Sequence, residues 1–582
     1  MGKSSITLRY LEMRGEARTG TSFYQRVGVR TLGMLLGPFA DSRCRSVGSP
    51  LPASDTTLHH RPRTHCSYWG VILLMIASTC CNAKEPTQVG TTAVPGKSDS
   101  TNPTITNQVT STGTVASSSA SQTASQTASQ TASPTGSSSV ESLWTRERGE
   151  DWPRMLGVHF DSRSSEKGIR TQWGPKGLPL VWSKPTGIGY GNGVTSKGRW
   201  FQFDRFGDVE RLSCYRAETG ESLWSWDAQV DYRDPYGYNN GPRCSPVVDG
   251  DYVYTYGVAG RLSCVRIADG KPVWSRDINT EYRVVPNFFG VGASPVIYGD
   301  FILAMVGGSP KRSAFSRSPT VNDLPGASPD GSAIVAFDKR TGNEVYRVGN
   351  YLASYSAPVI AKLDGVDHCV ALVREGLLVF RAIDGSGEQF FPWRAAMLES
   401  VNAASPLVFD EKIFISEAYE IGSAMLQWRD GKLEELWRDS GTRSSQSMRT
   451  HWNTPLLDGN TLFASSGRNQ PDTDLRALQI EGTDRPKVRW SHRNRDRGTA
   501  LIVDSHFLWL GETGKLQLIP TAAETYQVTA EMDLGSIIDP NDGKPLVDPP
   551  SWAPPVLSHG LLFIRGSDKL LCLELIPPKA AN

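Results

Sequence analysis

A short stretch recurs along the chain, and it constrains the fold more than any other feature. It reads Ala217-Glu-Thr-Gly-Glu-Ser-Leu-Trp224, then Ala268-Asp-Gly-Lys-Pro-Val-Trp274, then Asp338-Lys-Arg-Thr-Gly-Asn-Glu-Val-Tyr346. In each copy an aromatic residue follows the glycine by four positions. Asp-Gly and Thr-Gly supply the positive φ that a tight hairpin turn needs, so each copy predicts a turn between two strands. Repetition at this period predicts a β-propeller.

Two other elements repeat in register with the turn. The first has a small residue and a proline at the start of an apolar strand, as in Cys244-Ser-Pro-Val-Val248, Ala293-Ser-Pro-Val-Ile297, Ser356-Ala-Pro-Val-Ile360, Ala404-Ser-Pro-Leu-Val408, Asn453-Thr-Pro-Leu-Leu457 and Ala553-Pro-Pro-Val-Leu557. Proline is tolerated there because the first residue of a strand loses no ladder hydrogen bond. The second is a third strand, identical in Arg211-Leu-Ser-Cys214 and Arg261-Leu-Ser-Cys264 and similar in Lys569-Leu-Leu-Cys572.

Counting these elements gives seven complete four-strand units and an eighth that stops after its third strand, Cys572–Ile576. The missing outer strand is available as Leu178-Pro-Leu-Val-Trp182, at the other end of the repeats. We therefore predict an all-β fold over residues 173–578: an eight-bladed β-propeller of four-stranded antiparallel blades, closed by an N-terminal strand that completes the last blade. Closure removes the unpaired edges of an open sheet. Gly307–Asp330 and Ile538–Pro550 are the two long insertions, within blade three and between blades seven and eight.

The chain before the repeats divides into four segments. Residues 1–65 show no sustained period and are expected to be an unstructured leader, or translation starts later than Met1. Residues 66–83 hold an apolar run behind a basic flank, which is typical of a secretory signal. Three outcomes are open: cleavage after Ala83, lipidation of Cys80 or Cys81, and a retained membrane anchor. Residues 84–142 are a Ser/Thr-rich linker expected to be disordered, and residues 143–172 connect it to the repeats.

Charge excludes one class of partner. The chain has 61 Lys and Arg residues against 60 Asp and Glu, so no global field favours nucleic acid. We expect an exported protein of the periplasm or cell envelope, with membrane attachment through its N-terminal segment left open. The propeller itself is expected to be monomeric.

The turn-Gly-x-x-x-Trp copies and the Ser-Pro-Val strands resemble the PQQ-like repeat. This repeat is shared by quinoprotein alcohol dehydrogenases and by the outer-membrane-protein assembly lipoprotein BamB. The resemblance covers residues 173–578 and implies the propeller fold. Because one fold hosts unrelated sites, function must be argued from residues.

A dehydrogenase of this family implies a quinone held beside a ring of two adjacent disulfide-linked cysteines, with a calcium ion. Here the only adjacent cysteines, Cys80-Cys81, lie in the export signal. The histidines show no metal-site spacing. The sequence therefore predicts no catalytic, cofactor-binding or metal-binding residues. PQQ with calcium belongs only to the alternative, a quinone-dependent dehydrogenase or a carbohydrate-active propeller enzyme. A third alternative is a secreted structural module without a defined ligand.

Regular placement assigns five tryptophans to packing between neighbouring blades: Trp182, Trp224, Trp274, Trp437 and Trp490. The five cysteines after the signal are expected to be buried and unbridged: Cys214, Cys244, Cys264, Cys369 and Cys572.

The loops before the inner strands are the candidate binding surface. They are rich in Tyr, Arg and Trp, residues typical of partner contacts, and propeller loops of this kind converge on one rim. The candidates are Tyr236, Tyr238, Arg243, Arg283, Arg449, His451 and Trp452; the alternative is that these are ordinary solvated turns. The residues favour a scaffold, similar to BamB, that binds a protein or glycan at this rim and has no activity of its own.

Overall fold

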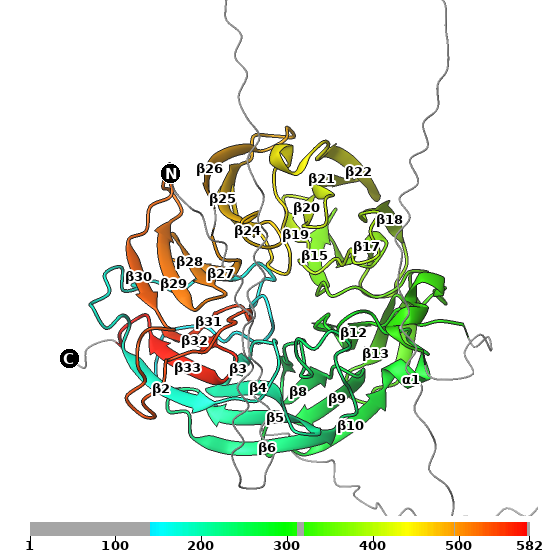
Figure 1. The fold of residues 1–582 in the computed structure, drawn as a ribbon. Coiled ribbons are helices and arrows are strands. Elements are labelled where there is room, and N and C mark those ends of the chain that lie inside the picture. Colours follow the sequence, from blue (N-terminus) through cyan, green and yellow to red (C-terminus); the bar gives the residue numbers. More distant parts are fainter. Residues whose placement is uncertain (1–139, 311–318, 494, 579–582) are drawn as a thin grey trace, which may run out of the picture. The chain divides into compact units, whose positions relative to one another are not determined.

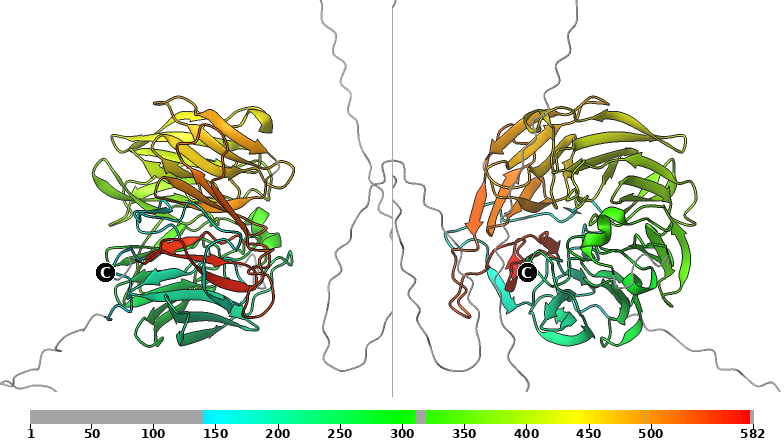
Figure 2. Two further views of the ribbon diagram at one scale, coloured as in Figure 1. Left: turned by 90° about the vertical axis from the view of Figure 1, so that its left-hand side faces the viewer. Right: turned by 45° about the vertical axis from the view of Figure 1, so that its right-hand side comes forward.

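Eight blades, each with four antiparallel strands, surround a central axis in the computed structural model, which describes residues 140–310, 319–493 and 495–578 (Figure 1). These residues all belong to one unit of the chain, Gln126–Asn582. The predicted eight-bladed propeller is confirmed, and Figure 2 shows the ring from two further sides.

Seven blades are continuous in sequence, and each runs from its inner to its outer strand. Blades one to four are β3 (Val194–Ser196), β4 (Arg199–Phe206), β5 (Val209–Arg216), β6 (Ser222–Gln229); β7 (Val247–Asp249), β8 (Tyr252–Tyr256), β9 (Arg261–Arg266), β10 (Pro272–Asp277); β11 (Val296–Tyr298), β12 (Phe301–Met305), β13 (Ile334–Asp338), β14 (Glu344–Val348); and β15 (Val359–Leu363), β16 (Val366–Leu372), β17 (Gly376–Arg381), β18 (Gln389–Pro392). Blades five to seven are β19 (Leu407–Phe409), β20 (Lys412–Glu417), β21 (Gly422–Arg429), β22 (Lys432–Arg438); β23 (Leu456–Asp458), β24 (Thr461–Ser466), β25 (Asp474–Gln479), β26 (Lys487–Arg493); and β27 (Gly498–Val503), β28 (His506–Gly511), β29 (Lys515–Pro520), β30 (Ala530–Asp533). The described helices are short: α1 (Ile278–Glu281), η1 (Val321–Gly326) and η2 (Arg443–Ser445).

The eighth blade joins the two ends of the domain. It consists of β31 (Val556–Ser558), β32 (Leu561–Arg565), β33 (Lys569–Glu574) and β2 (Leu180–Pro185). Strand β2 pairs antiparallel with β33, with Trp182 opposite Cys572, which confirms the predicted closure. In Figure 1 the red β33 lies beside the cyan β2.

The apolar core lies between the faces of neighbouring blades. One cluster joins Phe201 and Leu212 of blade one to Val253 and Val265 of blade two. Middle strands are buried on both faces, whereas outer strands such as β6 alternate between exposed and partly buried residues. This burial explains why the middle strands are continuous apolar runs.

The repeated turn docks each blade onto its neighbour. The Trp224 indole donates to the Ile267 carbonyl over 2.8 Å, and its ring lies against Gly270 in the turn of the next blade. Gly270 has a φ of +72°, and a Cβ there would lie 2.6 Å from Trp224 Cε3. The same arrangement places Trp182 against Gly220 and Trp274 against Gly342. The positive φ of the turn glycine and the close approach of the tryptophan ring to it together explain the Gly-x-x-x-Trp repeat.

The other two predicted packing tryptophans also lie between blades. The Trp490 indole donates to Ala523 O over 3.2 Å. Trp437 contacts Phe414 of its own blade and packs against a cluster that includes Leu462 and Leu478 of blade six. The five cysteines are buried and free, Cys214, Cys264 and Cys572 on equivalent third strands. No helix among the described residues is long and apolar enough to cross a membrane.

Residues 140–170 cross one face of the ring and contact most of the blades there. We call them the crossing segment. Val248 N–H donates to Pro153 O over 2.8 Å, and Ile502 N–H donates to Ser162 O over 2.9 Å. A two-residue strand, β1 (Arg163–Ser164), adds to blade seven in parallel with β27 and makes that sheet five-stranded. The repeat pattern does not reveal this strand, because it lies outside the repeats and is only two residues long.

Candidate binding site

A cavity of about 350 Å³ lies at the axis of the ring. Its walls come mainly from the loops that precede the inner strands, and every blade contributes. The lining residues are Met155, Tyr190, Tyr238, Arg243, Phe289, Gly292, Tyr355, Val401, Ala403, Tyr419, His451, Trp452, Arg468, Asn469, Arg497, Trp552 and Pro554. We call this cavity the axial pocket.

Aromatic rings form much of its wall. Trp552 contacts Trp452 at 5.1 Å and Tyr190 at 4.7 Å between ring centroids. On the other side the exposed Tyr238 meets Phe289 edge to face at 5.8 Å. Such rings present flat apolar surface together with polar edges, which is typical of recognition sites.

The crossing segment supplies one wall of the pocket. Met155 lines the cavity, and Ser294 Oγ lies 3.8 Å from its Sδ. The neighbouring Trp152 is 1% exposed, and its backbone N–H donates to Thr195 Oγ1 over 2.7 Å. The segment contacts the strands β3, β7 and β27 through backbone hydrogen bonds, so it closes the channel on its face. The pocket is therefore open toward the loops before the inner strands.

Two of the three arginines in the lining are neutralised by carboxylates. Arg243 Nη2 lies 2.9 Å from Asp234 Oδ2, and that aspartate side chain is fully buried. Arg497 donates to both oxygens of Glu512, with Nη2 2.6 Å from Oε2. The Arg497 guanidinium also lies 4.3 Å from the Trp452 ring centroid, where a cation is stabilised by the ring quadrupole.

The third arginine, Arg468, has its guanidinium 4.5 Å from the Tyr419 ring centroid. Among the described residues it forms no ion pair. The lining contains no Asp or Glu, so Arg468 leaves the pocket with an excess of one positive charge.

A neutral histidine, His451, contacts these groups in the lining. Burial, with the charges of Arg497 and Arg468, lowers the pKa of His451 to about 3. Its Nδ1 lies 3.4 Å from Arg497 Nη1, and its Nε2 lies 3.0 Å from Tyr419 Oη. Because a guanidinium can only donate, Nδ1 accepts and the ring proton resides on Nε2, which donates to the tyrosine oxygen.

Four of the seven residues predicted for the rim line this pocket: Tyr238, Arg243, His451 and Trp452. Tyr236 is exposed beside it and contacts Phe288 and Phe289. Arg283 has a φ of +53° and does not line the pocket. The sequence interpretation missed Arg468, Arg497, Tyr419, Tyr190 and Trp552. Arg497 and Trp552 precede inner strands as the predicted residues do, so the same signal could have found them.

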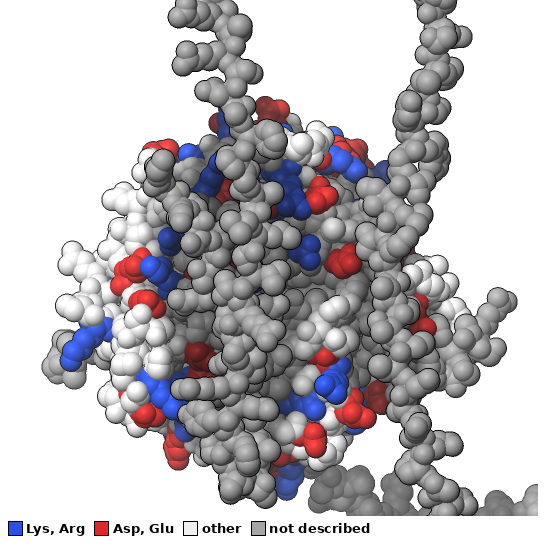
Figure 3. Space-filling model, viewed as in Figure 1, with Lys and Arg blue, Asp and Glu red and all other residues white. Residues whose placement is uncertain are grey.

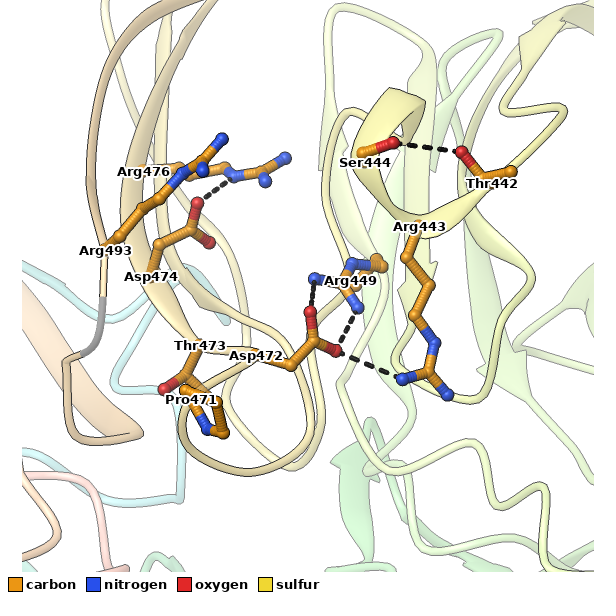
Figure 4. A pocket seen from close by; sticks show the side chains of 10 residues that line it. All are labelled: Thr442, Arg443, Ser444, Arg449, Pro471, Asp472, Thr473, Asp474, Arg476 and Arg493. Atoms are coloured by element: carbon orange, nitrogen blue, oxygen red, sulfur yellow. Dashed lines mark hydrogen bonds and ion pairs between the residues drawn. The ribbon is translucent and has the colours of Figure 1, made fainter. Parts of the chain in front are cut away.

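Arg449 lies elsewhere, in a second cavity of about 470 Å³ (Figure 4). Its side chain is 4% exposed and binds Asp472 through two hydrogen bonds, with Nη1–Oδ2 at 2.7 Å and Nη2–Oδ1 at 2.9 Å. Figure 4 shows Asp472 between Arg449 and Arg443, and Arg476 paired with Asp474. The two aspartates that line this cavity pair with three of its four arginines, and Arg493 forms no ion pair among the described residues. Arg449 therefore orders the loop that carries Asp472.

The rest of the visible surface carries no field of one sign. On the face shown in Figure 3, basic and acidic side chains are interspersed around the described part of the ring. This pattern agrees with the near-balanced composition of the chain.

The residues do not fit a calcium-bound quinone. Within the described ranges, no group of three or more His, Cys, Asp and Glu side chains could hold a metal ion. The five described cysteines occur singly along the chain, so no adjacent pair exists in this part to form a disulfide ring. We therefore derive no catalytic step through such a group.

Fold and pocket together define an eight-bladed propeller of PQQ-like repeats with a one-ended axial cavity. The sequence matches the family described as outer membrane protein assembly factor BamB over residues 170–315 and 208–530, and the chain belongs to this family. No curated protein sequence matches it.

Several solved structures are similar to this chain at low identity. BamB from Moraxella catarrhalis is 11% identical, with 70% of this chain and 99% of that chain covered and a TM-score of 0.43. Quinohemoprotein alcohol dehydrogenase from Comamonas testosteroni is 13% identical, with 74% and 82% covered and a TM-score of 0.40. The computationally designed Ika8 protein is 10% identical, with 68% and 100% covered and a TM-score of 0.41.

Proposed function

We propose that this chain is an exported binding protein that holds a protein partner at the open end of the axial pocket and has no catalytic activity of its own. The observation that carries the proposal is the pocket itself. Eight blades bring aromatic and arginine side chains together around one cavity, and such residues dominate the energetics of protein contacts. The BamB family supports a role in protein assembly in the cell envelope.

Export rests on the sequence of residues 66–83, which lie outside the described residues, as do the leader 1–65 and most of the linker 84–142. Fractionation of cells that express the full chain, with protease added to intact and to opened cells, tests this part. Cleavage only after the outer permeability barrier is opened would support an envelope location. Resistance until the cytoplasm is released would contradict it.

A photo-crosslinking residue placed at Tyr238 tests partner binding in the full chain. Tyr238 lines the pocket and is 62% exposed, and Val345, in the outer strand β14, is 50% exposed and serves as the matched control. We expect a discrete protein adduct from position 238 and none from position 345. Equal adducts from both positions, or none from either, would contradict a partner at the pocket.

A second measurement distinguishes the binding proposal from the enzyme alternative, a quinone-dependent dehydrogenase. The purified chain is incubated with PQQ and calcium, passed through a gel-filtration column and assayed for quinone absorbance and dye-linked alcohol oxidation. We expect neither retained quinone nor turnover. Retained quinone with turnover would replace the binding proposal with a dehydrogenase.

A further inference from the structure

We propose that the axial pocket binds the C-terminus of its partner polypeptide, with the terminal carboxylate at Arg468 and Tyr419 and an apolar last side chain against the aromatic wall. This inference rests on the proposed function, because it names the part of the partner that enters the pocket. Three observations lead to it: the charge of the lining, the hydrogen-bond donors it presents, and its closed end.

The charge of the lining favours an anion. Arg243 and Arg497 are matched by Asp234 and Glu512 at 2.9 and 2.6 Å, so they are structural cations with little charge left for a ligand. Arg468 has no such partner among the described residues, and its guanidinium lies over the face of the Tyr419 ring, which carries no negative charge to neutralise it. A carboxylate beside Arg468 would gain a charge-assisted hydrogen bond without displacing an internal acid.

The donors in the pocket point to the same ligand group. Burial raises the pKa of Tyr419, so its hydroxyl stays protonated at neutral pH. Its oxygen already accepts from Nε2 of the neutral His451 at 3.0 Å, so the hydroxyl proton is not used in that bond. His451 is the only hydrogen-bond partner that the described residues offer this hydroxyl. Tyr419 lines the cavity and can therefore donate to a ligand oxygen next to Arg468.

The closed end selects a chain terminus. The segment that contains Trp152 and Met155 blocks the channel opposite the open loops, so a polymer cannot pass through the ring. A pocket of about 350 Å³ is at the small end of ligand sites, so it admits a few groups and no folded element. The terminal residue of a protein presents a carboxylate and one side chain together, and capture of a C-terminal carboxylate is a known recognition mode.

Calorimetric titration of the full chain with a matched pair of pentapeptides tests this inference. The probe is Gly-Ser-Ala-Ala-Phe with a free C-terminal carboxylate, and its control is the same peptide with a C-terminal amide. We expect the acid to bind at least about tenfold more tightly than the amide. Arg468→Gln and Tyr419→Phe should each remove most of this preference.

Arg340→Gln is the control variant, because Arg340 is exposed in the turn between β13 and β14, away from the pocket. It should leave the preference intact. Tyr419 is buried, so its variant is first checked for unchanged thermal unfolding; Arg468 is partly exposed, and its variant tests the proposal even if Tyr419→Phe unfolds. Because His451 remains neutral above about pH 5, the acid's affinity should be constant from pH 5.5 to 8.

The outcomes separate this inference from the proposed function. Equal binding of acid and amide, or no binding of either, would overturn the C-terminal inference while an adduct at position 238 would still support a partner at the pocket. Tighter binding of glucuronic acid than of the acid peptide, lost in Arg468→Gln, would overturn it in favour of an acidic glycan. Loss of the adduct at position 238 together with tight peptide binding would contradict the proposed macromolecular partner alone.

Discussion

The two ends of the axial channel are built from different parts of the same repeat. The closed end uses first strands and their hairpin turns, covered by residues 140–170 through backbone hydrogen bonds and buried side chains. The open end uses the longer loops before the inner strands, with half-buried aromatic rings and arginines. Side chains at the closed end should therefore matter for stability, and those at the open end for binding.

The largest expected difference in unfolding free energy is between variants of two tryptophans, one at each end of the channel. Trp152 at the closed end is 1% exposed within the largest apolar cluster, whereas Trp552 at the open end is half-buried. Trp152→Ala should lower the free energy of unfolding by about 3–5 kcal/mol because it leaves a cavity. Trp552→Ala should cost about 1–2 kcal/mol at most. Denaturant unfolding measures both, and equal losses would contradict the division between the two ends.

Ionisable groups at the two ends should respond to pH in opposite directions. Burial raises the pKa of Glu166, at the closed end, to about 7, so its protonated form is favoured by folding. Its contribution to stability is fully present below about pH 4.5 and is lost as the pH rises through 7. The lowered pKa of His451 acts oppositely, since the unfolded chain gains a proton as the pH falls through about 6.5.

Glu166→Gln isolates the first of these effects. The amide resembles the protonated acid, so the variant should be more stable than the parent at pH 8 and similar to it at pH 5. Thermal unfolding at the two pH values is the measurement. A variant that is less stable at pH 8 would mean that the charged form of Glu166 is the one favoured by the fold.

A smaller difference in unfolding free energy is expected between variants of two arginines, one at each end of the channel. Arg146 Nη2 lies 3.0 Å from Glu574 Oε2, and its Nη1 donates to Ile576 O over 3.1 Å, so it ties the crossing segment to the last blade. Arg146→Gln should cost about 1–2 kcal/mol of unfolding free energy. Arg468→Gln, at the open end, should change it by less than about 0.5 kcal/mol. The reverse order in chemical denaturation would show that Arg468 stabilises the fold.

The smallest expected effect on stability is at the exposed edge of the pocket. Tyr238→Ala should leave the unfolding free energy within about 0.5 kcal/mol of the parent, because the ring is largely exposed. The same variant should weaken binding of the acid pentapeptide, measured by calorimetry. Unchanged binding would remove Tyr238 from the recognition surface.

The sequence was sufficient for the fold because its signals are periodic. Glycines such as Gly270, small-Pro strand starts and the Trp182 strand each have one local physical cause, and every blade repeats them. The pocket was predicted only in part. Residues near regular positions, such as His451 and Trp452, were found, but Tyr419 and Arg468 lie in turns between second and third strands, and nothing in their spacing reveals which way these turns face.

Arg449 was predicted for the binding rim but does not line the axial pocket. It is next but one to His451 in the chain, yet it lies in another cavity and pairs with Asp472. A regular strand would put residues two positions apart on the same side, so this loop departs from strand geometry, and composition alone does not separate a contact residue from one that orders the loop. The segment 140–170 was also unforeseen, because its contacts are with backbone groups far away in sequence.

The pairing of β2 with β33 has a consequence for how the protein is made. The strand at residues 180–185 leaves the ribosome long before its partner at residues 569–574, so the ring stays open for most of synthesis. During that time the last blade lacks its inner three strands, and β2 carries an unpaired edge that invites wrong pairing. Export of an unfolded chain would tolerate this delay, provided that the ring closes after both ends have arrived in the same compartment.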